Sequence, residues 1–153
     1  MEYGKFLSPI GIITFGLSNG QLCKLTIDDL NVFTTDSTDI YAVKHQLDLY
    51  FKGELKAFSL PIIFEEGTPF QREVWEALCT IPFGKSISYQ DLAHIVNRPK
   101  AVRAIGQACK RNPIGIVVPC HRVIGKNGQL TGYSGKDYIH IKQALLTLEK
   151  AYV

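Results

Sequence analysis

Apolar positions alternate along the first part of the chain and recur at helical spacing along most of the rest. Near the N-terminus, two β-prone runs, GIITFGL and QLCKLTI, flank Ser18-Asn19-Gly20. Asn-Gly tolerates the positive φ angles of a tight hairpin turn, and a period of two is typical of a half-buried strand. The pattern therefore predicts an antiparallel hairpin near the start of the chain.

A helix and a further strand are predicted after this hairpin. Four apolar residues recur at helical spacing before a glycine that would stop the helix: Ile40, Val43, Leu47, Tyr50 and then Gly53. The run FSLPIIF returns to strand character, with Pro61 indicating an edge position. Residues 1–66 are thus predicted to form a small antiparallel sheet with one covering helix.

The pattern changes near Gly67. Thr68 can cap a helix that has Pro69 in its favoured first position. The predicted apolar stripe of this helix consists of Phe70, Val74, Ala77 and Leu78. Trp75 is predicted to pack in the core.

Two short helices with a break between them are predicted next, in ISYQDLAHIV and AVRAIGQACKR. Ser88 and Asp91 have capping-box spacing, and Leu92, Ile95 and Val96 are predicted to face inward. Because the break is short and the second helix is basic, the pair is a helix-turn-helix candidate.

The second of these helices has two distinct sides. Its predicted core stripe is Val102, Ile105 and Cys109. Another face carries the polar residues Arg103, Gln107, Lys110 and Arg111. Much of the remaining surface has only small side chains, those of Ala101, Ala104 and Ala108. Small residues on a basic helix allow its backbone to approach a partner closely, although alanine is also simply a good helix former.

The last segment, DYIHIKQALLTLEK, predicts an amphipathic helix capped by Asp137. Ile141, Leu145 and Leu148 would pack inward, with Glu149 at the edge of that face. The predicted fold class is therefore α/β (α+β). It consists of an N-terminal sheet lobe, residues 1–66, and a mostly helical C-terminal lobe with the helix-turn-helix, residues 67–153.

Charge is distributed unevenly between the two predicted lobes. Residues 1–66 hold five basic and nine acidic residues, a balance of −4, whereas residues 67–153 hold twelve and five, a balance of +7. No acidic residue occurs from Leu92 to Lys136, a stretch with eight basic ones. A solvated basic face would account for this, but the pattern favours a polyanion such as nucleic acid.

Composition places the chain among ordinary globular proteins, with 46% hydrophobic and 20% charged residues. MEYGKF lacks the apolar region of a secretory signal, and no apolar run approaches the roughly 20 residues of a membrane span. The four cysteines show no zinc-site spacing and no CxxC pair. We expect a cytoplasmic monomer without cofactor, metal or membrane partner, in which all thiols except Cys120 are small buried hydrophobes.

Cys120 needs separate consideration because His121 and Arg122 follow it directly, after an apolar run, Ile114 to Val118, that Pro119 stops. A cysteine nucleophile acts as its thiolate and needs a neighbour that accepts its proton or lowers its pKa. Adjacent residues of a strand point to opposite faces, so a pairing of Cys120 with His121 requires a turn or a relaying water. Glu149 is the candidate carboxylate to orient the imidazole.

These residues also carry a resemblance to a known family. PCHRVIG, with Asn112-Pro113 upstream and Gly132-Tyr133-Ser134-Gly135 downstream, resembles the active-site segment of the O6-alkylguanine-DNA alkyltransferases. The similarity continues through TPFQREVWEAL, IPFGKSISYQDLA and KAVRAIGQACKRNP, and so covers essentially all of residues 67–153. The first lobe resembles the family only in its size and its hairpin-plus-helix pattern.

The resemblance implies direct, single-turnover repair of double-stranded DNA that contains O6-alkylguanine, with O4-alkylthymine as a further candidate substrate. Cys120 would accept the alkyl group as a permanent thioether, His121 would deprotonate it through a water, and Glu149 would hold the imidazole. Asn112 would stabilise the turn before the active site. The implied DNA and base contacts are Tyr89, Arg103, Ala104, Gln107, Tyr133 and Ser134, with Arg103 filling the gap left by an extruded base and the helix-turn-helix entering the minor groove.

This chain departs from the family pattern at Gly115, where some relatives carry proline, and at Lys136, where a second glycine is usual. Three alternatives stay open on the sequence: an alkyltransferase-like lesion sensor without repair activity, a helix-turn-helix regulator with an inert Cys120, and a Cys-His-Glu hydrolase. The acceptor cysteine argues against the sensor, and the basic, acid-free stretch argues against the hydrolase.

Overall fold

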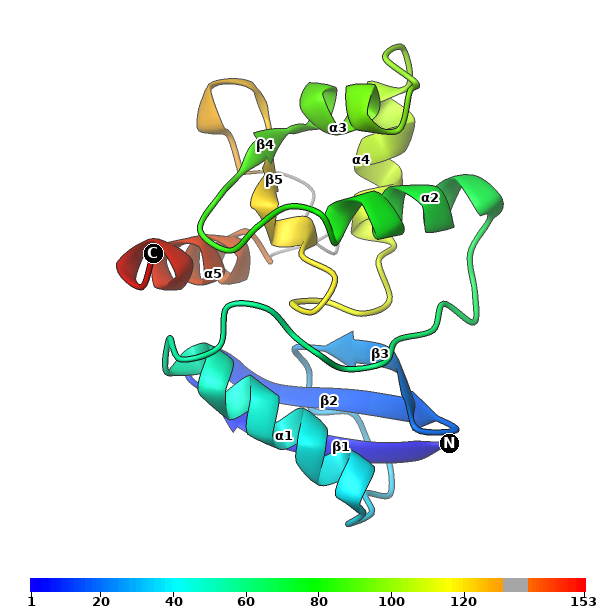
Figure 1. Ribbon diagram of the computed structural model, residues 1–153, viewed down its shortest axis with the longest axis vertical. Coiled ribbons are helices and arrows are strands. Elements are labelled where there is room, and N and C mark those ends of the chain that lie inside the picture. Colours follow the sequence, from blue (N-terminus) through cyan, green and yellow to red (C-terminus); the bar gives the residue numbers. More distant parts are fainter. Residues whose placement is uncertain (131–137) are drawn as a thin grey trace. The chain divides into compact units, whose positions relative to one another are not determined.

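A computed structural model describes residues 1–130 and 138–153 and has a mixed α/β fold (Figure 1). Its chain divides into two compact units. The first unit is Met1–Glu65 with the short segment Pro113–Gly115, and the second is Glu66–Asn112 with Ile116–Val153. The chain therefore returns to the first unit for three residues shortly before Cys120.

The first unit is built on a three-stranded antiparallel sheet of order β1-β2-β3. Strand β1 is Glu2–Ser8, β2 is Gly11–Ser18 and β3 is Gln21–Thr26. Asn19 and Gly20, with φ of 50° and 78°, form the turn between β2 and β3, which confirms the predicted hairpin. The alternating pattern did not identify β1, which pairs with β2 along its whole length.

Helix α1, Thr38–Phe51, lies across one face of this sheet (Figure 1). The Ser37 side chain caps its N-terminus by accepting a hydrogen bond from the Ile40 N–H. All four of the predicted apolar positions, Ile40, Val43, Leu47 and Tyr50, are buried. Gly53, with φ of 75°, follows the end of the helix as expected, because glycine adopts the left-handed region without steric cost.

The strand predicted in FSLPIIF is wrong, since the segment forms only a single bridge, between Leu22 and Ile62. Ile114, in the apolar run before Pro119, likewise forms only one bridge, with Leu25. Pro61 and Pro113 have no N–H to donate, so each of these pairings is limited to the bonds around one residue. The run is nevertheless buried.

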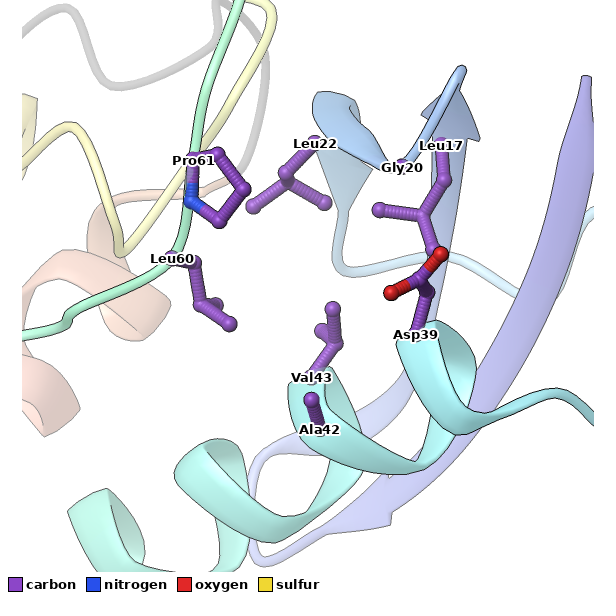
Figure 2. A pocket seen from close by; sticks show the side chains of 8 residues that line it. All are labelled: Leu17, Gly20, Leu22, Asp39, Ala42, Val43, Leu60 and Pro61. Atoms are coloured by element: carbon purple, nitrogen blue, oxygen red, sulfur yellow. The ribbon is translucent and has the colours of Figure 1, made fainter.

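A small cavity of about 50 Å³ lies within the first unit (Figure 2). Its lining is apolar except for Asp39 and consists of Leu17, Gly20, Leu22, Asp39, Ala42, Val43, Leu60 and Pro61. The side chains come from α1, from the β2–β3 hairpin and from residues 60–61, and they converge on the same hollow (Figure 2). None of the candidate site residues that the structure describes lines this cavity.

The second unit begins with helix α2, Pro69–Leu78. Thr68 and Gln71 form a reciprocal capping box, so the predicted cap at Thr68 and the proline in the first turn are both confirmed. Trp75 is 2% exposed and donates from its indole Nε1 to the Ala108 carbonyl at 2.8 Å. This hydrogen bond fixes α2 against the following helical pair.

Helices α3, Tyr89–Ile95, and α4, Val102–Lys110, are the predicted helical pair and lie next to one another. Ser88 and Asp91 form the predicted capping box at the start of α3. Leu92 and Val96 are buried, but Ile95 is 53% exposed, so its predicted inward orientation is wrong. Because α3 is only seven residues long, Ala93 rather than Ile95 completes its buried face.

The remaining elements of the second unit bring the Cys120 segment next to the last helix. Strand β4, Ile87–Ser88, pairs in parallel with β5, Val123–Ile124. The 3₁₀ turns η1, Cys120–Arg122, and η2, Lys126–Gly128, precede helix α5, Ile139–Ala151. Tyr138 is the N-cap of α5, without a side-chain hydrogen bond, and the predicted cap Asp137 lies outside the described residues. In the part of the chain that the structure describes, no helix is long and apolar enough to cross a membrane.

Candidate active site

The backbone turns sharply immediately before Cys120. Ile116 has a φ of 69°, an unfavourable value for a β-branched residue, and lies in the buried segment that leads to Pro119. The Cys120 N–H donates to the Val118 carbonyl at 2.9 Å, which closes a tight turn at Pro119. The 3₁₀ turn η1 follows, and in it the Arg122 N–H donates to the Pro119 carbonyl at 3.0 Å. The sequence predicted that a turn is needed here, and this turn places Cys120, His121 and Arg122 in one buried cluster.

Cys120 is a buried thiol, with 3% of its surface exposed. Burial raises the pKa of Cys120, because a thiolate loses its hydration in a low-dielectric environment. The side chain of Asn112, the nearby Lys142 and a backbone hydrogen bond act in the opposite direction and lower the pKa of Cys120. In the absence of substrate, the thiol is therefore held protonated by burial, while three neighbouring groups favour its thiolate.

His121 is fully buried and its Nε2 lies 2.7 Å from Glu149 Oε2. The burial lowers the pKa of His121, and the hydrogen bond that its Nε2 makes to the Glu149 carboxylate only partly offsets this. A neutral imidazole facing a carboxylate carries its proton on the facing nitrogen, so the lone pair is on Nδ1. Among the residues that the structure describes, Nδ1 has no hydrogen-bond partner. This nitrogen is consequently the free basic atom of the cluster.

Glu149 is 1% exposed, and its carboxylate accepts hydrogen bonds from several of the described residues. Besides His121, Arg122 donates through Nε at 2.8 Å to Oε1 and through Nη2 at 3.0 Å to Oε2. The Gly84 N–H donates to Oε1 at 3.2 Å. Charge-assisted, bidentate contacts of this kind are strong and directional, so the carboxylate is fixed in charge and in position.

Arg122 is itself held in place by groups other than Glu149. Its Nη1 donates to the Ile81 carbonyl at 2.6 Å, and its guanidinium lies 5.8 Å from the centre of the Phe83 ring. The predicted pairing of His121 with Glu149 is present, whereas the bidentate role of Arg122 was not predicted. Its signal in the sequence is only that a basic residue directly follows the Cys-His pair.

Asn112 lies between helix α4 and the Cys120 segment. Its side-chain Nδ2 donates to the Val118 carbonyl at 2.8 Å, and its backbone N–H bonds the Cys109 carbonyl at 3.3 Å. These contacts tie the end of α4 to the backbone two residues before Cys120. The turn-stabilising role of Asn112 stays a prediction.

Tyr89 is at the first residue of α3 and contacts a residue that sequence reasoning missed. Lys142 Nζ, on α5, lies 3.3 Å from the Tyr89 hydroxyl and 5.5 Å from the centre of its ring. The Lys142 side chain is 0% exposed, which is rare for lysine. A signal was present, because Lys142 falls between Ile141 and Leu145 on the apolar face of the predicted helix.

Helix α4 presents the candidate DNA-contacting residues to solvent. Arg103, Ala104 and Gln107 are all exposed, and Ile105 and Cys109 are buried as predicted. Ala108, expected on the outer surface, is instead 2% exposed, and its backbone carbonyl accepts the hydrogen bond from the Trp75 indole. Gly106 has open space above it, so the outer surface of the helix stays shallow there.

Two candidate base-pocket residues, Tyr133 and Ser134, lie outside the described residues. Within the described ranges, 1–130 and 138–153, no group of three His, Cys, Asp or Glu side chains is arranged to hold a metal ion. Cys79 is exposed rather than buried, contrary to expectation, whereas Cys23 and Cys109 are buried.

Residues 69–151 match the family model of the 6-O-methylguanine DNA methyltransferase, DNA binding domain. This match spans α2 to α5 and includes the whole Cys120 cluster. The chain belongs to the O6-methylguanine-DNA methyltransferase family. The sequence-based resemblance is thereby confirmed.

Curated relatives and solved structures of this family cover most of the chain. The constitutive methylated-DNA–protein-cysteine methyltransferase of Bacillus subtilis is 55% identical over 115 residues, which are 75% of this chain and 68% of that protein. The corresponding protein of Methanosarcina acetivorans is 45% identical over 97% of this chain and 98% of its own length.

A crystal structure of the Mycobacterium tuberculosis protein in complex with DNA superposes with a TM-score of 0.90. Its sequence is 42% identical, and the superposition covers 100% of this chain and 95% of that one. The O6-methylguanine methyltransferase of the same organism gives 0.89 at 41% identity over 99% of this chain and 94% of that chain. The predicted fold class, including the first lobe, is therefore confirmed.

Proposed function

We propose that the chain repairs DNA by transferring the alkyl group of O6-alkylguanine to its own Cys120, once per molecule. The activity is that of the family, a methylated-DNA–protein-cysteine methyltransferase. The observation that supports the role of Cys120 is its place beside His121, whose Nε2 is bound by Glu149 and whose Nδ1 is left as a base. O4-alkylthymine is a second candidate substrate.

Deprotonation of Cys120 is the first chemical step. A water accepts the thiol proton and passes one to His121 Nδ1, so that a thiolate and an imidazolium form. The imidazolium lies 2.7 Å from the Glu149 carboxylate, which compensates its charge inside the protein. Arg122 and Gly84 keep that carboxylate ionised and oriented throughout.

In the transfer step, the thiolate sulfur attacks the alkyl carbon as the bond from that carbon to O6 breaks. The electron pair stays on the guanine, which takes up a proton and becomes an unmodified base. Tyr89 lies next to Lys142 and is the candidate donor of this proton, or the contact to the phosphate of the extruded nucleotide. A thioether is not a leaving group under these conditions, so each molecule reacts once.

Access to O6 requires the base to leave the duplex. Extrusion costs a few kcal/mol because stacking and pairing are lost. We assign residues 67–153 to the DNA-binding and acceptor lobe, with the exposed face of α4 entering the minor groove. Arg103 fills the gap in the duplex, while Ala104 and Gln107 contact its backbone. Asn112 holds the turn that links this helix to Cys120.

The base pocket is assigned by resemblance to Tyr133 and Ser134, with Ser134 hydrogen-bonding near O6. No cofactor takes part in this reaction, because Cys120 supplies the nucleophile and a protein side chain supplies the proton that the guanine takes up. We infer a monomer that acts in the cytoplasm on double-stranded DNA.

The intact mass of the protein after incubation with a duplex carrying one O6-methylguanine tests this function. We expect one added methyl, mapped to Cys120 and saturating at one per molecule. Cys120→Ala should bind the lesion and transfer nothing, whereas Cys79→Ala, which removes an exposed thiol, should transfer normally. Lesion binding with an unchanged mass would point to a sensor, and an unchanged mass without lesion preference would point to a regulator.

A further inference from the structure

A short turn, residues 81–85, joins α2 to β4 and is fixed at both of its ends (Figure 1). The Ile81 N–H donates to the carbonyl of Leu78, the last residue of α2, at 3.1 Å. After the turn, β4 pairs with β5, which starts directly after Arg122. This 81–85 turn is therefore held beside the Cys120 cluster, and all of its contacts described below lie within the second unit.

Both charges of the buried ion pair, Arg122 and Glu149, are contacted by this turn. The Ile81 carbonyl accepts from Arg122 Nη1 at 2.6 Å. The Phe83 ring, which is half-buried, has its centre 5.8 Å from the Arg122 guanidinium. The buried Gly84 N–H donates to Glu149 Oε1 at 3.2 Å. One short piece of chain thus acts on the cation and on the anion of the same pair.

These contacts determine which oxygen of Glu149 faces the imidazole. Oε1 accepts from the Gly84 N–H at 3.2 Å and from Arg122 Nε at 2.8 Å. Oε2 accepts from Arg122 Nη2 at 3.0 Å and lies 2.7 Å from His121 Nε2. Rotation of the carboxylate would break the bonds on Oε1, so Oε2 stays opposite His121. A neutral imidazole in this position keeps its proton on Nε2 and leaves Nδ1 as the base.

The direction of the Gly84 N–H depends on a backbone conformation that favours glycine. Gly84 has a φ of 78° and is the third residue of a turn in which the Lys85 N–H donates to the Pro82 carbonyl at 3.1 Å. A β-branched residue strongly disfavours this left-handed region, whereas asparagine enters it more readily. The residue at position 84 therefore sets the orientation of the N–H that holds Glu149.

We propose that the 81–85 turn is a positioning element of this site, which holds the buried ion pair so that His121 keeps its proton on Nε2. Phe83 and Gly84 are its positioning residues, and both act through the ion pair. The proposal rests on the proposed function, in which His121 Nδ1 accepts a proton, and deepens it. It assigns the tautomer of His121 to a segment about forty positions before Cys120 in the chain.

The purely structural alternative is that the 81–85 turn only connects α2 to β4. Substitutions in the turn would then lower stability without changing which ring nitrogen of His121 carries the proton. The tautomer of His121 is therefore the informative observable. Nitrogen-15 NMR of the imidazole reports it, because a protonated and an unprotonated ring nitrogen differ in chemical shift.

The test uses the full chain with nitrogen-15-labelled histidine and no DNA, and the His121 signals are assigned by their loss in His121→Asn. Gly84→Val disfavours the left-handed backbone, whereas Gly84→Asn tolerates it. Both add a Cβ that meets the exposed side chain of Val153, so their difference isolates the backbone conformation. Gly128→Val is the matched control, because Gly128 also has a φ of 78° but has open space where the Cβ would lie.

Phe83→Leu is a second, milder variant that keeps an apolar side chain and removes the ring next to Arg122. Its matched control is Phe70→Leu, because the Phe70 ring centre lies 5.5 Å from the guanidinium of Arg98, outside the Cys120 cluster. This pair of variants decides the question if Gly84→Val fails to fold.

We expect the wild type to carry the His121 proton on Nε2 alone. Gly84→Val should show both neutral tautomers, and its single-turnover methyl transfer should slow about 10- to 100-fold, because misplacing a catalytic group by about 1 Å costs rate on this scale. Phe83→Leu should change in the same direction by a smaller amount. Gly84→Asn should stay close to the wild type, and the variants of Gly128 and Phe70 should match it.

Several results would overturn the proposal. One is a wild-type protein with the His121 proton on Nδ1, and another is slower transfer by the Gly84 and Phe83 variants with an unchanged tautomer. If Gly84→Asn changes as much as Gly84→Val, contact with Val153 and not the N–H direction is responsible. An equal change in Gly128→Val would reveal a general effect of backbone strain. If Gly84→Val does not fold, an unchanged tautomer in Phe83→Leu is sufficient to refute the role of the turn.

These measurements separate this proposal from the proposed function. The tautomer of His121 is observed without DNA, whether or not the protein takes a methyl group. A tautomer that changes in the variants of a protein that never accepts a methyl would refute the proposed function alone. Normal methyl transfer by the wild type, with an unchanged tautomer in Gly84→Val and Phe83→Leu, would refute the role of the 81–85 turn alone.

Discussion

Replacing Glu149 by glutamine tests the core of the mechanism with a change of one atom. Within the described residues, Glu149 accepts hydrogen bonds from Arg122, through two nitrogens, and from His121 and Gly84. An amide oxygen can keep some of these, but its NH₂ group must face either a donor of Arg122 or the Nε2 of His121. The substitution therefore removes the negative charge and also disturbs the hydrogen-bond pattern of the imidazole.

The expected loss of stability follows from the burial of Arg122, which is 7% exposed. Removing one partner of a buried ion pair leaves the other charge uncompensated, at a cost of about 3–5 kcal/mol. The expected loss of rate is separate. If the amide donates to Nε2, the imidazole proton moves to Nδ1 and the base is lost, which costs about 10²- to 10⁴-fold in the transfer rate constant.

Single-turnover transfer from an O6-methylguanine duplex measures the rate, and urea unfolding measures the stability. Glu73→Gln is the matched control, because Glu73 forms an exposed ion pair with Arg98 at 3.4 Å. Such pairs contribute about 0–1 kcal/mol, so this control should change the transfer rate and the stability only slightly. A Glu149→Gln variant that transfers methyl at the wild-type rate would refute the assignment of Glu149 and His121.

Three further predictions address the DNA contact, the local fold and the pH dependence. Arg103→Ala should slow transfer much more on duplex DNA than on the free O6-methylguanine base, because only the duplex needs its gap filled; equal slowing in the two assays would contradict this role. Ser88→Ala, which removes the N-cap of α3, should lower the free energy of unfolding by about 1 kcal/mol in urea titrations, with Ser88→Thr as the conservative control. Burial holds the pKa of His121 below its ordinary value of 6.5, so the unfolded chain takes up a proton that the folded chain does not, and stability should fall as pH drops below about 6.5. In urea unfolding, His121→Asn should reduce the fall of the unfolding midpoint at acidic pH. His94→Asn, outside the buried cluster, should show the same fall as the wild type.

Local signals predicted much of the fold because they depend on neighbours in the sequence. The caps at Thr68 and Ser88 and the turn at Asn19-Gly20 each involve residues within three positions of one another. The strand predicted around Pro61 is wrong because the segment pairs with β3 at one residue only, Ile62 with Leu22. An alternating pattern indicates strand character, but it does not indicate how many residues pair with the neighbouring strand.

The candidate site was predicted where chemistry is concentrated in one short motif and missed where it is assembled across the fold. Cys120 and His121 are adjacent, and Glu149 followed from the need for a carboxylate. Arg122 was noted only as a basic neighbour of Cys120, and Lys142 looked like an ordinary charge. Their roles depend on burial against segments more than 25 positions away, which spacing along one helix does not reveal.

The return of residues 113–115 to the first unit has a consequence for synthesis of the chain. The Leu25 N–H donates to the Pro113 carbonyl and the Gly115 N–H donates to the Leu25 carbonyl, so part of the outer edge of β3 is completed by a segment made nearly ninety positions later. As the polypeptide leaves the ribosome from its N-terminus, the first unit cannot reach its final pairing until most of the second has emerged. The two units therefore mature together, and a nascent chain arrested before residue 113 presents an unfinished sheet edge that can pair with another chain.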